Sequence, residues 1–267
     1  MIMFNALKAT YVYCYETLIT FDKGFHFNCD NKPLTDKRKL DIATIAFNNE
    51  QVIAEQVRLL NKNLLDPYCY TVADNSCDPA KQELIMRICE ELQVGYIKLP
   101  RNFYNRRAPS SSHGLALNWV YKNYIRPRQA HFFGFTDHDI YPTRPTSIIG
   151  FLEKSPVYGL IQEREEVWYL WPGFCFFKRD YIKDKDLNFM PSKRGDTGAG
   201  NWASVYSKLD KSKVPCLRHE YSQLGERENN LIEYIGDWLH TFNASNWRKV
   251  EGQENKSNLV TEILSKY

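Results

Sequence analysis

The stretch FFGFTDHDIYP, residues 132–142, places a run suited to a buried strand directly before Asp137, His138 and Asp139. In extended backbone, side chains two positions apart point to the same side, so the two aspartates would point together. Two carboxylates held that close repel each other unless a positive charge lies between them. A divalent cation would supply that charge. A chance pair of loop aspartates is the alternative that this stretch alone leaves open.

The composition is that of an ordinary globular protein of 267 residues, with 43% hydrophobic and 25% charged residues. The formal net charge of +3 argues against wholesale binding of nucleic acid. We find neither a signal peptide nor an apolar run of about 18 residues that could span a membrane. Seven cysteines, an odd number with no C-x-x-C pair, argue against a zinc knuckle and a disulfide framework and favour reduced thiols in a cytosolic protein.

Short apolar runs and amphipathic segments alternate from residue 41 onward. Three of the runs begin at residues 42, 68 and 94, which are 26 residues apart, and this spacing predicts successive βαβ units of a parallel sheet. Asp78, directly before Pro79, is expected to cap a helix. Strands are expected at 42–47, 68–73, 94–99, 131–136, 157–162 and 168–177, charged loops at 178–196, and helical or irregular segments from there to Tyr267.

The first 40 residues do not share this pattern. Residues 1–29 are rich in Tyr, Phe and Thr and could add a strand or hairpin at a sheet edge, whereas residues 30–39 read as a polar linker. We therefore expect an N-terminal extension, 1–40, packed on a single domain over 41–267. The halves of this domain would be residues 41–142 and 143–250.

Polar side chains follow each predicted parallel strand. They occur at residues 47–49 (FNN), 73–78 (ADNSCD), 100–102 (PRN) and 137–139 (DHD). Ligands of open parallel sheets bind beyond the carboxyl ends of the strands, and a purely structural sheet has no need of such groups there. The sequence therefore predicts a ligand site at this edge of the sheet.

Several segments, taken in order, resemble the motifs of GT-A glycosyltransferases, close to glycosyltransferase family 2. TIAFNNEQVIAEQVRLL (44–60), VADNSCD (72–78), SSSHGLALNWV (110–120) and FTDHDIYP (135–142) resemble the nucleotide-sugar-binding half, and WYLWPGF (168–174) and GDTGAGNW (195–202) the acceptor half. The resemblance covers about residues 41–245. It implies an α/β fold of the GT-A type, a single Rossmann-like domain with a mixed, mainly parallel central sheet.

The activity that this resemblance implies is metal-dependent, inverting transfer of a sugar. The donor would be a nucleotide-diphosphate sugar, UDP- or GDP-linked, and the acceptor a hydroxyl of a glycan or glycolipid. Asp74 would read the donor base, and Asp137 and Asp139 would hold Mn²⁺ or Mg²⁺ against the diphosphate. The implied donor-binding set is Phe47, Asn49, Asp74, Asn75, Asn102, His113, Asn118, Asp137 and His138.

Structural roles are the alternatives for some of these residues. An Asx turn would equally account for Asp74 and Asn75. A third metal ligand is expected from a late histidine, and His240 in DWLHTFNASNW is favoured over His219 in LRHEYSQLG because its context looks more like that of the family's histidine. A histidine buried in the core is the alternative for His240.

The resemblance also assigns the acceptor side. Asp196 in RGDTGAGNW matches the family's acceptor-side acid and would be the catalytic base, with a turn or helix cap as the alternative. Trp171 and Gly173 in LWPGF would shape the acceptor pocket, and Trp171 could instead belong to the core.

Two other functions stay open on the sequence. A sugar nucleotidyltransferase also uses acidic metal ligands on an α/β sheet, but AFNNEQ (46–51) lacks the glycines and basic residues of its phosphate loop. A catalytically inactive carbohydrate-binding or scaffold protein is the second, and the intact acids at positions 74, 137, 139 and 196 argue against it. Contact of the aromatic N-terminal region with a membrane surface is also open.

Overall fold

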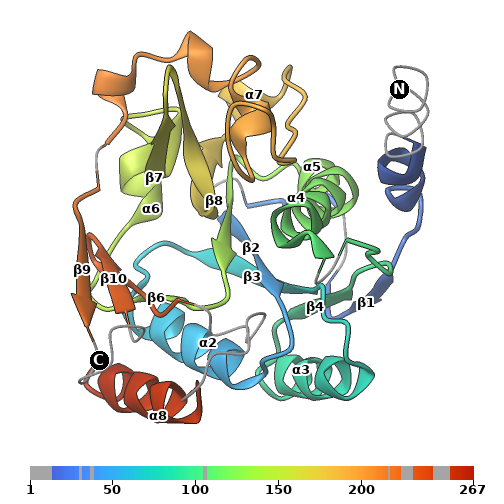
Figure 1. The fold of residues 1–267 in the computed structure, drawn as a ribbon, viewed down its shortest axis with the longest axis vertical. Coiled ribbons are helices and arrows are strands. Elements are labelled where there is room, and N and C mark those ends of the chain that lie inside the picture. Colours follow the sequence, from blue (N-terminus) through green and yellow to red (C-terminus); the bar gives the residue numbers. More distant parts are fainter. Residues whose placement is uncertain are drawn as a thin grey trace.

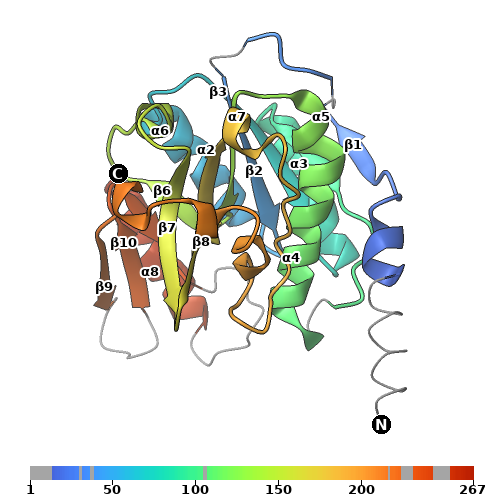
Figure 2. The same ribbon diagram turned by 90° about the horizontal axis from the view of Figure 1, so that it is seen from above.

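Figures 1 and 2 show the computed structural model of the chain, which describes residues 14–29, 32–36, 39–104, 107–215, 217–223, 231–242 and 253–267. Residues 1–13 of the predicted N-terminal extension and Cys216 lie outside the described residues.

A seven-stranded sheet forms the centre of the molecule, in the order β1-β4-β3-β2-β5-β8-β7. The four strands β4, β3, β2 and β5 are parallel, and the flanking strands β1, β8 and β7 are antiparallel to their neighbours. The strands are β1 Phe25–Phe27, β2 Leu40–Ala46, β3 Tyr68–Asp74, β4 Gly95–Lys98, β5 Phe132–Asp137, β7 Val157–Arg164 and β8 Val167–Lys178. The predicted α/β fold with a mixed central sheet is confirmed.

Helices cover both faces of this sheet (Figures 1 and 2). They are α2 Gln51–Asn63, α3 Pro79–Glu91, α4 Pro109–Val120, α5 Arg126–Arg128, α6 Ile148–Leu152, α7 Arg179–Ile182 and α8 Gln253–Leu264, with a π-helical turn, Tyr121–Ile125, after α4. All seven residues of β2 are buried, as expected for a parallel strand covered on both faces. The predicted helix cap is confirmed, because Asp78 Oδ1 accepts a hydrogen bond from the Ala80 N–H at 2.9 Å.

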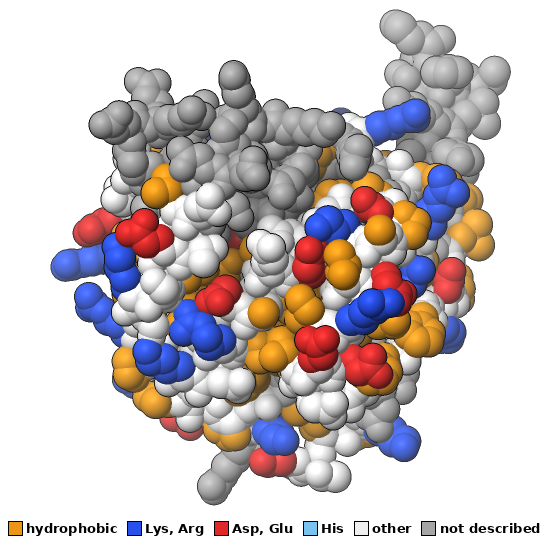
Figure 3. All heavy atoms as spheres, turned by 90° about the horizontal axis from the view of Figure 1, so that it is seen from below, with side chains coloured by type: hydrophobic (Ala, Val, Ile, Leu, Met, Phe, Trp, Pro, Cys, Tyr) orange, Lys and Arg blue, Asp and Glu red, His pale blue; other side chains and the backbone are white. Residues whose placement is uncertain are grey.

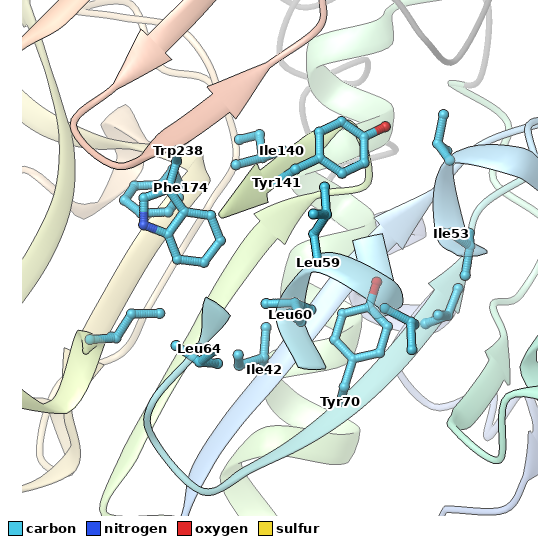
Figure 4. Packing of buried hydrophobic residues seen from close by; sticks show 14 of the residues in the cluster. Ile42, Ile53, Leu59, Leu60, Leu64, Tyr70, Ile140, Tyr141, Phe174 and Trp238 are labelled. Atoms are coloured by element: carbon cyan, nitrogen blue, oxygen red, sulfur yellow. The ribbon is translucent and has the colours of Figure 1, made fainter. Parts of the chain in front are cut away.

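Two hydrophobic clusters lie on opposite faces of the sheet. Ile42 of β2 packs with α2 and α3 in the first cluster, and Ile45 packs with α4 in the second. Figure 4 shows how the first cluster reaches from α2 to Phe174 of β8 and Trp238, two buried rings whose centroids are 4.9 Å apart. The first cluster therefore joins the central sheet to the C-terminal part of the chain.

A second, antiparallel sheet of four strands was not predicted. Its order is β6-β11-β10-β9, with β6 Ile140–Pro142, β9 His219–Gln223, β10 Leu231–Ile235 and β11 Trp238–His240. The expectation of helical or irregular structure is therefore wrong for residues 219–223, 231–235 and 238–240. β9 is exposed at every position and β11 has three residues, so neither shows the alternation of apolar and polar side chains by which a strand is recognised.

The described part of the N-terminal segment lies against the edge of the large sheet. Residues 14–19 are helical, and β1 pairs with β4, so the strand expected at a sheet edge is found at Phe25–Phe27. The indole Nε1–H of Trp119 on α4 donates to the carbonyl oxygen of Asp22 at 2.8 Å. This segment is therefore fixed to both β4 and α4.

A buried ion pair lies at the start of the central strand. Asp41 of β2 is fully buried, and its Oδ2 accepts from Nε of Arg128 at 2.8 Å. The guanidinium of Arg128 also lies over the ring of Tyr124, 4.8 Å from the ring centroid. The pair links α5, which follows α4 and the π-helical turn, to β2 in the middle of the sheet.

On the face shown in Figure 3, acidic and basic side chains are interspersed, in agreement with the net charge of +3. Among the described residues, no helix combines the length and the apolar character needed to cross a bilayer.

Candidate active site

The turn at residues 137–139 joins the two sheets. Asp137 is the last residue of β5 in the large sheet, and Asp139 directly precedes β6 in the small one. The buried side chain of Gln56 on α2 holds this turn, because its Nε2 donates to the carbonyl oxygens of Asp137 at 2.8 Å and Ile140 at 2.7 Å. Asp139 lies in the turn after β5, so the premise that both aspartates stand in extended backbone is wrong, whereas their pointing together stays a prediction.

Each aspartate is paired with a histidine from another part of the chain. Nε2 of His113 on α4 lies 3.2 Å from Oδ1 of Asp137, and Nε2 of His240 on β11 lies 3.7 Å from Oδ1 of Asp139. The two imidazole rings can supply the positive charge that neighbouring carboxylates need. The fold thus brings four of the predicted site residues into one cluster.

The charges in this cluster shift one another's pKa values. Burial alone would lower the pKa of His240, but Asp139, a hydrogen bond to Glu233 and Asp137 together raise it. Burial would raise the pKa of Asp137, whereas the charge of His113, followed by that of His240, lowers it. Both aspartates act on both histidines, so the four groups form one electrostatic unit.

Glu233 is a residue of this site that the sequence did not indicate. It lies directly opposite His240 in the β10–β11 pair, and its Oε2 is 3.1 Å from Nδ1 of His240. Its side chain is 4% exposed and that of His240 is 6% exposed, so water does not compete strongly for this contact. With Nδ1 directed to Glu233, Nε2 of His240 is the nitrogen that faces Asp139.

The second candidate histidine contacts the same carboxylate from the other side. Nδ1 of His219 lies 3.1 Å from Oε1 of Glu233, and its side chain is 48% exposed. Burial would raise the pKa of Glu233, but its hydrogen bonds and charge interactions with His240 and His219 lower it. His240 therefore faces the aspartates, and His219 is separated from them by Glu233.

The segment after β2 lies beside the aspartate turn. The backbone N–H of Phe47 donates to Nδ1 of His138 at 3.4 Å, so these two predicted donor-site residues meet. The ring of His138 is buried, and burial lowers its pKa. Oδ1 of Asn49 accepts from the Gln51 N–H at 3.2 Å, which places Asn49 at the start of α2.

Asp74 is fully buried at the end of β3. Its Oδ1 accepts from the Ser76 N–H at 2.9 Å and its Oδ2 accepts from the Tyr96 hydroxyl at 3.0 Å. The first contact is the Asx turn considered as the alternative role. Recognition of a base by Asp74 stays a prediction, and it requires these contacts to open.

Asn75 and Asn102 form a buried amide network with the first turn of α4. Nδ2 of Asn75 donates to Oγ of Ser112 at 3.0 Å, and Nδ2 of Asn102 donates to the Ser112 carbonyl oxygen at 2.9 Å. This network fixes the helix turn that carries His113. Ser112, like Glu233 and Gln56, acts through a contact that is distant in sequence and was not predicted.

Asn118 lies farther along α4 and is engaged elsewhere. Its Oδ1 accepts from the Phe189 N–H at 2.8 Å, and its Nδ2 donates to Oδ1 of Asn188 at 3.1 Å. Its side chain thus holds the loop after α7 on α4, and the structure does not bring it to the aspartates. A donor-binding role for Asn118 stays a prediction.

Gly173 and Trp171 on β8 lie next to Asp137. A Cβ atom built on Gly173 would be 2.7 Å from Oδ2 of Asp137 and 2.4 Å from Cζ2 of Trp171, so only glycine leaves room for both groups. The ring centroids of Trp171 and His240 are 4.9 Å apart. The predicted acceptor-side residues therefore border the histidine–aspartate cluster.

Asp196 lies in the loop before the short 3₁₀ turn Ala199–Asn201 and is exposed. Its Oδ1 accepts from the Thr197 N–H at 2.8 Å, and Oγ1 of Thr197 donates to the Ser110 carbonyl oxygen on α4 at 3.0 Å. The charge of Asp196 helps raise the pKa of His113. Asp196 is thus fixed near the cluster with its carboxylate open to solvent.

The donor atoms of this cluster fit a divalent ion. Carboxylate oxygens suit Mn²⁺ or Mg²⁺, and a metal-binding histidine commonly directs its other nitrogen to a carboxylate, as His240 does to Glu233. Within the described ranges, no three acidic, histidine or cysteine side chains already have the spacing of a metal centre. Binding would therefore draw Asp137, Asp139 and His240 together around the ion.

The sequence matches no protein-family model and no curated protein. Among solved structures, the chain aligns with the mannosyltransferase PcManGT from Pyrobaculum calidifontis, in complex with GDP-Man and Mn²⁺. That alignment covers 65% of this chain and 53% of the mannosyltransferase, at 14% identity and a TM-score of 0.40. The chain also aligns with S. aureus TarS over 57% of this chain and 30% of TarS, at 18% identity and a TM-score of 0.39.

A shorter form, TarS 1–349 in complex with UDP, aligns over 57% of this chain and 50% of that one, at 18% identity and a TM-score of 0.38. This chain thus spans about half or less of the length of these proteins. At these identities and TM-scores the alignments carry no argument about the activity, donor or acceptor of this chain.

Proposed function

We propose that the chain is a metal-dependent, inverting glycosyltransferase of the cytosol. It would move a sugar from a UDP- or GDP-linked donor to a hydroxyl of a glycan or glycolipid. The observation that carries the proposal is the cluster at the junction of the sheets, where Asp137 pairs with His113 and Asp139 with His240, and where a separate, exposed carboxylate, Asp196, lies close by. No two described cysteines form a disulfide, which suits a reducing compartment.

Each group in the cluster has a distinct task in this reaction. Asp137, Asp139 and Nε2 of His240 would hold the ion, which when bound neutralises charge on the departing diphosphate. Asp196 would take the proton from the acceptor hydroxyl. Gly173 leaves room beside Asp137 for the indole of Trp171, which would border the acceptor.

The geometry favours this activity over nucleotidyl transfer. The loop after β2 contains no glycine, and it is tied to the loop after β3 because the Asn48 N–H donates to Oγ of Ser76 at 2.7 Å. A loop fixed in this way does not form the open glycine-rich cradle that binds a triphosphate. A catalytically inactive sugar-binding protein is distinguished by turnover, because it would release no nucleoside diphosphate in the presence of acceptor.

Asp139→Ala should abolish the metal-dependent part of nucleotide binding. UDP or GDP with Mn²⁺ should raise the Tm of the wild-type protein, by an amount equivalent to about 2.7 kcal/mol at a hundredfold excess over Kd. The variant lacks the carboxylate that faces His240 and should show the same small shift with and without Mn²⁺. Asp180→Ala, which removes an exposed acid on α7, is the control and should behave as wild type. Retained Mn²⁺-dependent stabilisation in Asp139→Ala would contradict the proposal.

Glu233→Ala should weaken Mn²⁺ binding about 10–100-fold, because it removes the carboxylate that orients His240. Glu233→Gln should lose less, since an amide oxygen can still accept from Nδ1–H. Titration of Mn²⁺ followed by electron paramagnetic resonance measures this without any turnover. His219→Ala, which leaves the contact between Glu233 and His240 in place, is the control. A larger effect from His219→Ala than from His240→Ala would show that the wrong histidine was assigned.

A further inference from the structure

Four aromatic rings, here called the aromatic row, run from the aspartate cluster to the surface. They are Trp171, His240, Phe242 and Tyr221. The ring centroids of Trp171 and His240 are 4.9 Å apart, those of His240 and Phe242 are 4.1 Å apart, and those of Phe242 and Tyr221 are 6.0 Å apart. The row starts beside Asp137, where Trp171 packs over Gly173, and it crosses from the large sheet to the small one.

The outer end of the row is open to solvent. Tyr221 is 60% exposed, and all five residues of β9 are exposed at the edge of the small sheet. Residues at alternate positions of a strand share a face, so His219 and Gln223 lie on the same side of β9 as Tyr221. An exposed ring is therefore flanked by two side chains that can form hydrogen bonds.

The backbone of the row is strained at one position. Phe242 has a φ of 27°, in a region that bulky side chains seldom adopt. Its ring nevertheless stacks on that of Tyr221 with an interplanar angle of 18°. Strain of this kind persists where the surroundings require a particular side-chain position, and it is concentrated at ligand sites. Here it places the Phe242 ring between the buried His240 and the exposed Tyr221.

We propose that Trp171, Phe242 and Tyr221 of the aromatic row form a binding subsite for the sugar rings of an oligosaccharide acceptor. This inference rests on the proposed glycosyl transfer and extends it to the class of acceptor. The C–H face of a pyranose packs on the electron-rich face of an aromatic ring. Its hydroxyls need donors and acceptors around that contact, which His219 and Gln223 provide.

The position of the row determines which part of the acceptor it would bind. The reacting hydroxyl must lie near Asp196 and the aspartate cluster, so the units next to it would extend along Trp171 and Phe242 to Tyr221. A pocket for the lipid portion of an acceptor would need an apolar lining at this end, whereas the exposed face of β9 carries His219 and Gln223 around one ring. The row therefore fits a chain of sugars better than a lipid.

A glycan array tests this subsite with the full-length protein in the presence of Mn²⁺ and UDP or GDP. Wild type should bind oligosaccharides on the array, and Tyr221→Ala should bind the same glycans about tenfold more weakly, since it loses the stacking surface. Tyr221→Phe keeps the ring and should retain most of the binding. Phe21→Ala, which removes a ring 71% exposed in the N-terminal segment, is the control and should bind as wild type.

The outcomes separate this subsite from the proposed reaction. Loss of glycan binding in Tyr221→Ala, with an unchanged Mn²⁺-dependent thermal shift by nucleotide, supports the subsite. Wild type that binds no glycan, or Tyr221→Ala that binds as strongly as wild type, overturns it even if nucleotide binding is intact. If the glycosyltransferase assignment itself is wrong, UDP or GDP with Mn²⁺ should not raise the Tm of the wild-type protein.

Discussion

Asp196→Asn should lower turnover by about 10²–10⁴-fold, the usual contribution of a positioned carboxylate that takes a proton in the transition state. An acceptor hydroxyl is a weak nucleophile until its proton is removed, and inversion requires it to attack from the face opposite the diphosphate. Asn has nearly the shape of Asp, and its side-chain oxygen can still accept from the Thr197 N–H, a contact of 2.8 Å in the wild type. The loop should therefore keep its position and lose only the base.

The measurement is release of nucleoside diphosphate in the presence of acceptor, with nucleotide binding followed in parallel. Binding should stay within a few-fold of wild type, because a loss confined to turnover indicates an interaction made in the transition state. Asp180→Asn, which changes an exposed acid on α7, is the matched control. Near-normal turnover by Asp196→Asn would show that Asp196 has only a structural role in its turn. The base would then be sought among Glu163, Glu165 and Glu166.

Arg128→Met should lower the free energy of unfolding by about 3–5 kcal/mol, because it leaves the buried Asp41 carboxylate without its cation. Methionine retains an apolar side chain of similar length near the ring of Tyr124, so the loss comes mainly from the uncompensated charge. Urea unfolding measures it. Arg126→Met changes an exposed arginine of the same short helix and should have little effect.

The pH dependence gives this prediction a second test. Burial raises the pKa of Asp41, against the opposing effect of Arg128. A group whose pKa is higher in the folded state binds a proton on folding, so its stabilisation is lost as the pH rises through the folded pKa. Removal of Arg128 raises that pKa further, so the loss should be smaller at about pH 5 than at about pH 7.5.

A double variant, Asp41→Asn with Arg128→Met, should recover part of the stability, because no buried charge remains. A loss that is the same at both pH values, or a double variant no more stable than Arg128→Met, would contradict this account.

The central sheet could be predicted because its strands carry a local signal. The parallel strands are buried on both faces and read as continuous apolar runs, and their predicted bounds differ from the observed ones by two residues or fewer. The small sheet carries no such signal. β9 is polar and exposed throughout, and β6 and β11 are too short to show a period. Its strands are defined by pairing across long sequence separations.

The sequence likewise indicated some residues of the candidate site and not others. Asp137, Asp139 and Asp196 stand in motifs that the sequence analysis singled out, and His240 is preferred to His219 by its context, so the roles of these four residues are predictions from the sequence. Glu233 could not be predicted in this way, because its role depends on lying opposite His240 in a sheet that the sequence does not reveal. The sequence also did not indicate that Asp74 is completely buried, because its hydrogen-bond partner, the hydroxyl of Tyr96, comes from the neighbouring strand.

The join between the sheets also affects biosynthesis. A ribosome delivers the chain from its N-terminus, and every strand of the large sheet is available once residue 178 has emerged. β6 is made early, but it pairs with β11, whose residues 238–240 come much later. A nascent chain that has emerged beyond residue 178 but not as far as residue 233 holds Asp137 and Asp139 on the large sheet without Glu233 or His240. The proposed site is therefore completed only after residue 240 has emerged, and if the proposed function holds, nascent chains shorter than this should be unable to consume nucleotide sugar.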